Sequence, residues 1–311
     1  MGYWNSTING ASRRPKTGCD ISPGDAEVIM KISLLTDAPK HNLALMKIAQ
    51  WHVKNGDYVD LNMPVFPADY RYASLLFERS RHTFQADEYG GPAIKDSVLN
   101  AEFESMKPYY DLYPNNDYSL GYTYRPCSNT CHFCKVPQMN HPDIDHHSIW
   151  EFHNPKFKKI CILNNNTFQD PKWKETFEEI WDAGLTVIDE NGYDLRLIDE
   201  EKADALHRTR FATPLHFAWD RMVDEPLIRR GLESIGKHKM RSTSNGVYVL
   251  IGYDTTVEED LYRCQIIDEF GLTPYPMPFM KNNYTKRFKR FMNLHYYRKY
   301  KTIKEAWENY S

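Results

Sequence analysis

Long apolar runs and strong net charge are both missing from this 311-residue sequence. Its longest apolar stretches, such as Val247–Gly252, are far shorter than the roughly 20 residues needed to span a bilayer. The N-terminal segment contains no apolar signal core. The 39 Lys and Arg residues nearly balance the 42 Asp and Glu residues, which argues against a wholly basic nucleic-acid-binding protein. We therefore expect a soluble cytoplasmic protein that makes no contact with membranes.

Cysteine is scarce as well, and its distribution is uneven. Three of the six cysteines fall within eight residues, whereas Cys19, Cys161 and Cys264 are scattered. A small secreted protein held together by disulfides would instead show an even and dense set of cysteines. The pattern favours a reducing compartment. Cys161 and Cys264 lie on predicted helices or strands, so we expect both to be small buried apolar side chains.

The N-terminal third predicts an extension followed by a first domain. Residues 1–29 are rich in Gly, Ser, Asn, Pro and charge, which predicts a flexible extension and leaves open whether Met1 or Met30 is the native start. Beyond Met30, short apolar strands alternate with a helix that carries apolar residues at helical spacing. The expected elements are a strand at 31–36, a helix at 42–54 and strands at 58–61 and 72–77. This order predicts a Rossmann-like open parallel sheet over residues 30–115, with an irregular connection over 87–118.

A second domain is predicted over residues 116–280, where strand and helix alternate repeatedly. After a first strand near Ser119, the expected elements are strands at 159–163, 185–189, 215–219 and 247–251 and helices at 173–183, 200–208, 226–235 and 257–270. Such repetition requires a parallel sheet covered by helices. The sequence therefore predicts an α/β protein whose second domain is a full or partial (β/α) barrel, with reactive groups at the carboxyl ends of the strands.

The cysteine cluster is the strongest functional signal. Cys127, Cys131 and Cys134 form a CxxxCxxC run on one predicted loop. Thiolates suit zinc or iron–sulfur centres, and a cubane held by three cysteines leaves its fourth iron open. A zinc site completed by His132 or His141 is the alternative, although the usual zinc signature has a second close pair of ligands that this sequence lacks. The spacing favours a [4Fe-4S] cluster, and an electron-transfer cluster with a fourth, distant cysteine is a further alternative.

The cysteine run, with Phe133 directly before its third member, resembles the signature loop of the radical SAM superfamily. The resemblance covers residues 119–279 and implies a partial barrel of radical SAM type. It also implies that the open iron chelates the amino and carboxylate groups of S-adenosylmethionine. One electron from an external donor such as flavodoxin or ferredoxin then breaks a sulfur–carbon bond and leaves a 5′-deoxyadenosyl radical.

The resemblance carries over to residues that follow the later strands. Asn164, Asn165 and Asn166 stand where the superfamily places a motif for the methionyl amino group, but that motif is usually Gly-rich with an acid, and this sequence departs from it. An ordinary polar loop is the alternative. Asp194 and Arg196 stand where ribose or carboxylate groups are commonly bound, and a bidentate Arg suits a carboxylate. A surface ion pair is the alternative there.

Two further strand ends contribute candidates. Gly252 resembles the glycine that lets the adenine lie against the backbone, and a plain strand-ending glycine is the alternative. Asp220 is a candidate at the end of the preceding strand, whereas His216 is expected to be structural. The sequence assigns no catalytic residue, no substrate and no oligomeric state.

Residues 30–84 resemble the cobalamin-binding-type domain that precedes the barrel in one branch of the superfamily, with Asn42–Lys47 carrying the likeness. A cobalamin-ligating histidine would lie in a DxHxxG loop after the first strand. Asp37 and His41 have the wrong spacing for that loop, and its glycine is missing. We therefore do not expect bound cobalamin, which disfavours methylation through methylcobalamin.

The C-terminal segment, residues 281–311, predicts a basic and aromatic helical tail. Between Lys281 and Lys304 there are nine Lys and Arg residues and no acid. We expect the aromatic side chains to cover the barrel while the cations face water. The alternative is nucleic-acid binding through phosphate contacts and base stacking. A zinc-stabilised nucleic-acid-binding module and a pure electron carrier are thus the rivals of the enzyme.

Overall fold

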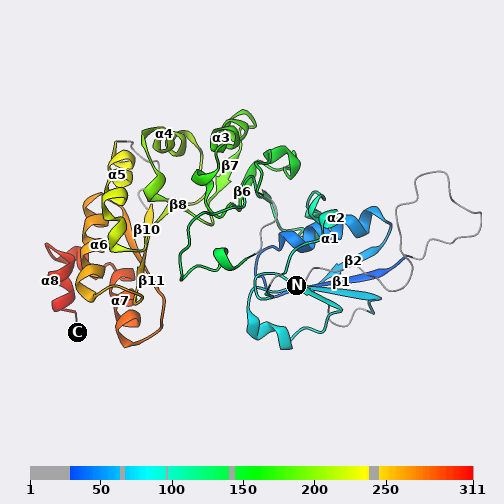
Figure 1. Cartoon of the computed structure of the whole chain (residues 1–311), viewed down its shortest axis with the longest axis horizontal. Coiled ribbons are helices and arrows are strands. Elements are labelled where there is room, and N and C mark those ends of the chain that lie inside the picture. Colours follow the sequence, from blue (N-terminus) through cyan, green and yellow to red (C-terminus); the bar gives the residue numbers. More distant parts are fainter. Residues whose placement is uncertain (1–28, 64–66, 96, 140–143, 238–244, 311) are drawn as a thin grey trace, which may run out of the picture. The chain divides into compact units, whose positions relative to one another are not determined.

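The computed structural model describes residues 29–63, 67–95, 97–139, 144–237 and 245–310 (Figure 1). The chain divides into a first unit, Met1–Asn116 with Lys135–Pro142, and a second unit, Asp117–Cys134 with Asp143–Ser311. Every strand pair found in the two units is parallel, so the predicted α/β class is confirmed. The predicted extension lies outside the described residues, apart from Ile29. In the parts of the chain that are described, no helix has the length and apolarity required to cross a membrane.

The first unit contains one parallel sheet in the order β2-β1-β3-β4. Its elements are β1 (Lys31–Thr36), α1 (Leu43–Lys54), β2 (Tyr58–Leu61), β3 (Tyr70–Ser74), β4 (Glu88–Gly90) and α2 (Ala101–Glu104). The Asn42 side chain caps α1 by accepting a hydrogen bond from the backbone N of Leu45. This is the strand order in which doubly wound sheets begin. The open parallel sheet predicted for the first domain is therefore present.

The expected irregular connection over 87–118 was wrong in two respects, because it contains the strand β4 and the short helix α2. Residues Glu88–Gly90 form β4 and extend the sheet beside β3. Nothing in this short segment alternates between apolar and polar positions, so the sequence pattern gave no strand signal. Strand β3 also begins two residues earlier than predicted, at Tyr70.

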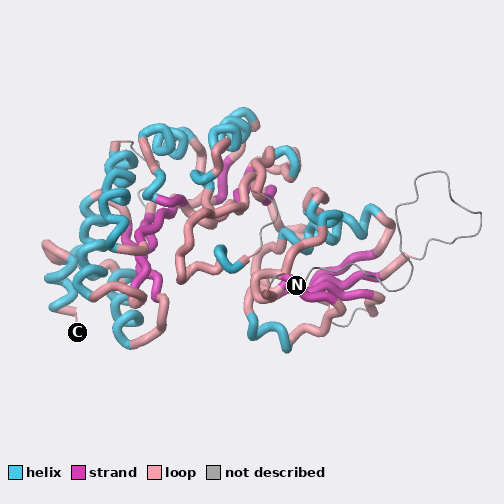
Figure 2. Tube along the Cα trace, in the orientation of Figure 1, coloured by secondary structure: helices cyan, strands magenta, loops and turns pink. Residues whose placement is uncertain are grey.

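The second unit contains two parallel sheets, in the orders β5-β6-β7 and β11-β10-β9-β8. The strands are β5 (Ser119–Gly121), β6 (Lys159–Ile162), β7 (Thr186–Ile188), β8 (Tyr193–Asp194), β9 (His216–Trp219), β10 (Gly246–Ile251) and β11 (Thr273–Pro278). The helices are α3 (Trp173–Asp182), α4 (Glu200–Arg208), α5 (Glu225–Gly236), α6 (Val257–Glu269), α7 (Asn283–Asn293) and α8 (Ile303–Glu308). Helices α3 to α6 follow one another along the outer side of the strands (Figures 1 and 2).

Strands β7 and β8 act as one interrupted strand. Only residues 189–192 separate them, and Gly192 turns the chain there with a φ of 74°. Val187 in β7 also bridges Phe211, in the segment that leads into β9. From β5 to β11, neighbours in the chain are therefore neighbours in space.

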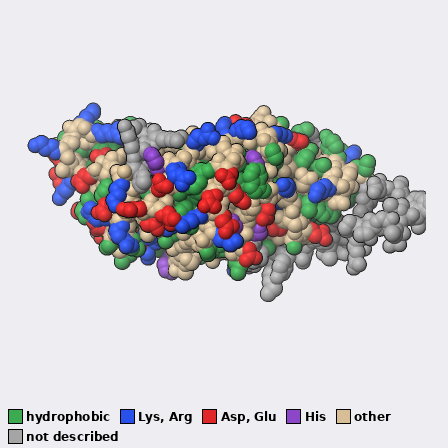
Figure 3. All heavy atoms as spheres, turned by 90° about the horizontal axis from the view of Figure 1, so that it is seen from above, with side chains coloured by type: hydrophobic (Ala, Val, Ile, Leu, Met, Phe, Trp, Pro, Cys, Tyr) green, Lys and Arg blue, Asp and Glu red, His purple; other side chains and the backbone are tan. Residues whose placement is uncertain are grey.

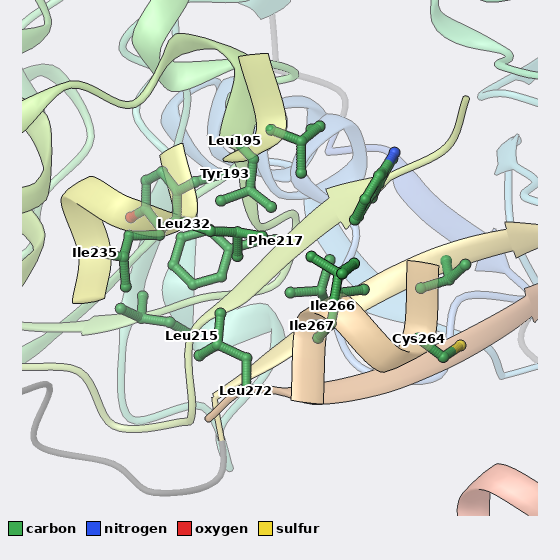
Figure 4. Close-up of a cluster of buried hydrophobic side chains, with 14 of the residues drawn as sticks. Tyr193, Leu195, Leu215, Phe217, Leu232, Ile235, Cys264, Ile266, Ile267 and Leu272 are labelled. Atoms are coloured by element: carbon green, nitrogen blue, oxygen red, sulfur yellow. The ribbon is translucent and has the colours of Figure 1, made fainter. Parts of the chain in front are cut away.

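A large apolar core lies between the β8–β11 sheet and its helices. Figure 4 shows Leu215 and Phe217 of the β9 segment beside Ile266, Ile267 and Leu272 of the α6 segment. Cys161 and Cys264 are fully buried, which confirms their prediction as small core residues. Three aromatic side chains of the tail, Phe288, Phe291 and Tyr297, belong to the same core. The tail is therefore an integral part of the second unit.

Strand β11 was not predicted because prolines occupy alternate positions along it. Pro274, Pro276 and Pro278 have no N–H group, which normally argues against a strand. The intervening residues supply the ladder to β10, and the backbone N of Thr273 and of Phe279 continue it at either end. Since β11 is the last strand of its sheet, the backbone nitrogens of the prolines lie along the edge that pairs with no other strand.

Candidate functional site

The cysteine loop, residues 125–134, follows β5 and is fastened to the carboxyl ends of later strands. The backbone N of Ser128 donates to Oε1 of Gln169, beyond β6, at 2.6 Å. The amide Nδ2 of Asn129 donates to Oδ2 of Asp194, at the end of β8, at 3.2 Å. Both residues lie between the first and second cysteines. This part of the loop is therefore tied to two successive strand ends of the same unit.

The aromatic residue directly before the third cysteine contacts an aromatic residue that follows β10. The ring of Phe133 packs edge-on against Tyr253, with centroids 5.6 Å apart. Tyr253 packs in the same manner against Phe279, which follows β11, at 4.8 Å. Tyr253 and Phe279 both remain open to solvent, with 37% and 45% of their surfaces exposed. A row of three aromatic rings thus joins the cysteine loop to the β10 and β11 ends.

All three cysteines of the loop are partly exposed, and none of them belongs to a disulfide. The backbone N of Cys134 donates to the carbonyl O of Cys131 at 2.9 Å, which closes a tight turn. Burial raises the pKa of the Cys131 thiol, although the Arg196 guanidinium opposes the effect. Within the described residues, no three His, Cys, Asp or Glu side chains are gathered closely enough to hold a single metal ion. The donors themselves fit an iron–sulfur cluster, since three soft thiols on one loop can each bind a different iron.

Two of the three predicted asparagines hold the backbone that enters the cysteine loop. Oδ1 of Asn164 accepts from the backbone N of Thr123 and of Tyr124, both at 2.9 Å, and its Nδ2 donates to Oγ1 of Thr123. Nδ2 of Asn165 donates to the carbonyl O of Arg125 at 2.6 Å. In this structure these amides are engaged with the protein itself.

The third asparagine, Asn166, is different. Its Nδ2 donates to Oδ2 of Asp194 at 3.0 Å, but its Oδ1 is buried and accepts no hydrogen bond from any described residue. The whole residue is only 7% exposed. A buried acceptor without a partner costs about 1–3 kcal/mol. A ligand that brought an N–H or O–H donor to this oxygen would recover that cost.

Asp194 and Arg196 form an ion pair that is largely buried. Nε and Nη2 of Arg196 donate to the two carboxylate oxygens of Asp194 at 2.8 and 2.7 Å. A third contact, from Nη1 to Asp224, measures 3.4 Å. Burial raises the pKa of Asp194, but the bonds from Arg196 and Asn166 outweigh it and hold that pKa below its usual range. The pair is not on the surface, and the bidentate edge predicted to meet a ligand carboxylate faces Asp194.

Asp220, at the end of β9, carries the least satisfied carboxylate of the site. Burial raises its pKa to about 6, although Arg263 and Arg196 favour the ionised form. Among the described residues, none donates a hydrogen bond to this carboxylate. Asp220 also acts on Cys131, whose pKa it raises. It is therefore a group available to a ligand beside the cysteine loop.

A buried guanidinium holds the backbone at the carboxyl ends of β9 and β10. Arg263 of α6 is fully buried and pairs with the equally buried Asp260. It donates to the backbone carbonyl groups of Trp219, Asp220 and Leu250 at 2.8, 3.0 and 2.7 Å. An Asp and an Arg three positions apart on a helix usually indicate a surface pair, so sequence reasoning missed this support.

Contacts within the chain itself explain why position 252 is a glycine. Its φ of 70° lies in the left-handed region, and a Cβ there would stand 2.7 Å from Cγ2 of Thr285 in α7. The close approach of an adenine to this glycine stays a prediction. His216, expected to be structural, stacks on Tyr248 with centroids 5.0 Å apart.

Asp37 of the first unit also has internal partners. Its carboxylate accepts from the backbone N of Leu76 and of Phe77, beyond β3, at 2.7 and 3.1 Å. Burial raises the pKa of Asp37, but these bonds outweigh it and lower that pKa. The residue thus secures the exit of β3.

Sequence reasoning missed Asn129, Asp224, Tyr253 and Phe279 as members of the site. No motif marks them, because each reaches the site only through the packing of strand ends. No protein-family model and no curated protein sequence matches this chain. The function is therefore argued from the geometry of the second unit.

Proposed function

We propose that this chain is a radical SAM enzyme in which Cys127, Cys131 and Cys134 hold a [4Fe-4S] cluster. The observation that carries the proposal is the attachment of the cysteine loop to the ends of β6, β8 and β10. A zinc knuckle that only stabilises a loop needs no such ties to a row of strand ends. A loop built to act on a ligand held at those ends does need them.

The strand order of the second unit supports the same conclusion. Six consecutive strand positions, with β7 and β8 counted as one, run in chain order with helices on their outer side. A partial barrel of radical SAM type would have this order, with its reactive groups at the carboxyl ends. Edge strand β11 would then form one side of the opening.

The chemistry that such a cluster supplies, when bound and reduced by an external donor such as flavodoxin or ferredoxin, is one-electron cleavage of S-adenosylmethionine to methionine and a 5′-deoxyadenosyl radical. The residues of this chain bind and orient. Oδ1 of Asn166 would accept from the methionyl ammonium group, and the carboxylate of Asp220 would accept from ammonium or hydroxyl groups. Phe133 and Tyr253 would flank the adenine and exclude water.

The test is anaerobic reconstitution with iron and sulfide, dithionite reduction with S-adenosylmethionine, and chromatography for 5′-deoxyadenosine. Wild type is compared with Cys131→Ala and with Cys161→Ala, which makes the same chemical change at a buried cysteine outside the loop. We expect 5′-deoxyadenosine from wild type and from Cys161→Ala, and none from Cys131→Ala.

Two outcomes would replace the proposal. A fully loaded and reduced cluster that leaves S-adenosylmethionine intact would indicate an electron carrier. Zinc without sulfide, in protein purified without added metal and refractory to reconstitution, would indicate the zinc-stabilised binding module.

A further inference from the structure

Strand β11 leaves one of its faces open. Successive side chains of a strand point to opposite sides. Pro274 and Pro276 are buried, whereas Tyr275, Met277 and Phe279 are 41, 43 and 45% exposed. With Tyr253 beside Phe279, these residues form an exposed aromatic strip next to the candidate site. Folded proteins seldom leave such a strip uncovered without a binding role.

A basic surface begins where this strip ends. Lys281, Lys286 and Arg290 are exposed and Lys289 is half-buried, and none of these four forms an ion pair with a described carboxylate. No acidic residue occurs between positions 270 and 304. Elsewhere, charges of both signs are interspersed, as on the face shown in Figure 3. Helix α7 starts beside the site, since its Thr285 would meet a Cβ placed on Gly252 at 2.7 Å.

We propose that the aromatic strip and the basic surface of α7 together bind a single-stranded nucleic acid and present a nucleotide to the candidate site. The proposal rests on the proposed function, whose substrate it names. Cations that follow the phosphates and aromatic rings on which bases stack are the two features that single-strand binding combines. The strip supplies the rings and α7 supplies the cations.

Two other polymers fit less well. A peptide that added a strand to the free edge of β11 would need N–H donors, and Pro274, Pro276 and Pro278 present none. A duplex keeps its bases stacked within the helix, so it would leave Tyr275 and Phe279 uncovered. The aromatic residues of the tail, such as Phe288 and Phe291, are fully buried and offer no stacking surface.

The test is fluorescence anisotropy of the full chain with labelled single-stranded RNA and DNA of mixed sequence, about 20 nucleotides long. Lys281→Glu/Lys286→Glu removes cations at and before the first turn of α7, where added acids favour the helix. The control, Lys174→Glu/Arg230→Glu, makes the same charge change at exposed positions of α3 and α5. Tyr275→Ser/Phe279→Ser tests stacking, and circular dichroism verifies that each variant is folded.

We expect the α7 variant to lose at least tenfold in affinity and to bind with a shallower salt dependence, by about 0.7 in the log–log slope for each phosphate that it no longer neutralises. The stacking variant should also lose about tenfold, with its salt dependence unchanged. An equal loss in the control, or undiminished binding by the stacking variant, would overturn the proposal. So would preferential binding to duplex DNA or to anionic phospholipid vesicles. Because these measurements require no S-adenosylmethionine cleavage, their failure is distinguishable from failure of the proposed enzyme activity.

Discussion

Asn129 and Asp194 lie 65 positions apart in the chain and are joined by one hydrogen bond of 3.2 Å. The bond connects the cysteine loop to a carboxylate that also accepts hydrogen bonds from Asn166 and Arg196. Asp194 thus links the loop to the ends of both β6 and β8. The position of the cysteines depends on side chains that a motif search does not weigh.

The first prediction concerns this link. Asn129→Ala removes one partly buried hydrogen bond, worth about 0.5–1.5 kcal/mol. We expect unchanged iron and sulfide content and a several-fold, up to about tenfold, lower rate of 5′-deoxyadenosine formation per cluster. Ser128→Ala is the matched control, since Ser128 is tied through its backbone N. Equal rates in the two variants would remove Asn129 from the positioning of the loop.

A second prediction separates two costs at Gly252. Gly252→Ala should lower the free energy of unfolding in urea by about 1–2 kcal/mol for the left-handed backbone alone, with an additional cost for the contact with Thr285. Thr285→Ser removes Cγ2 but keeps the hydroxyl that caps α7. In the double variant the contact cost should disappear and the backbone cost should remain. Strict additivity of the two substitutions would contradict the close packing seen here.

The buried Arg263 supports a third prediction. Arg263→Met leaves Asp260 buried without its cation and should lower the free energy of unfolding by about 3–5 kcal/mol. The exposed Arg230→Met should change it by less than about 0.5 kcal/mol. The double variant Asp260→Asn/Arg263→Met should lose less free energy of unfolding than the sum of the losses in the two single variants. A small effect of Arg263→Met, measured by urea denaturation, would show that its carbonyl contacts contribute little.

The fourth prediction concerns pH and the first unit. Burial raises the pKa of Glu88 to about 7, although the hydroxyl of Tyr70 donates to it and opposes the shift. Because the folded-state pKa is raised, the stability that Glu88 contributes is complete below about pH 4.5 and is lost as pH rises through 7. Glu88→Gln lacks this loss. Its advantage over wild type should therefore grow by about 1–2 kcal/mol between pH 5 and 8, after allowance for solvent screening of a half-exposed group.

The measurement for Glu88 is urea denaturation at several pH values. Glu102→Gln, at an exposed position of α2, serves as the matched control. A difference from wild type that stays constant with pH in Glu88→Gln would contradict the raised pKa.

Periodicity predicted most of the regular elements because their apolar residues face a core. Helix α4 occupies Glu200–Arg208 as expected, and β10 differs by one residue. Strands β4 and β11 escaped prediction because one is short and polar and the other alternates with proline. Their pairing is decided by a neighbouring strand rather than by local sequence.

The site was predictable only where a local motif exists. The cysteine spacing indicated the loop, the resemblance to the superfamily indicated Asp194, and the end of an expected strand indicated Asp220. The different contacts of the asparagines in this run could not be predicted, because Asn164 and Asn166 differ only in what surrounds them. Arg263 was hidden for the same reason, since its burial depends on the packing of α6.

The core position of Phe288, Phe291 and Tyr297 has a consequence for biosynthesis. The sheet from β8 to β11 cannot close its core until residues 283–310 have left the ribosome, because these side chains fill it. The first unit can fold earlier, as N-terminal domains generally do during synthesis. Throughout that interval Asn129 and Phe133 lack Asp194 and Tyr253 in their final places. The proposed cluster would therefore find these loop contacts in place only after the segment has been translated.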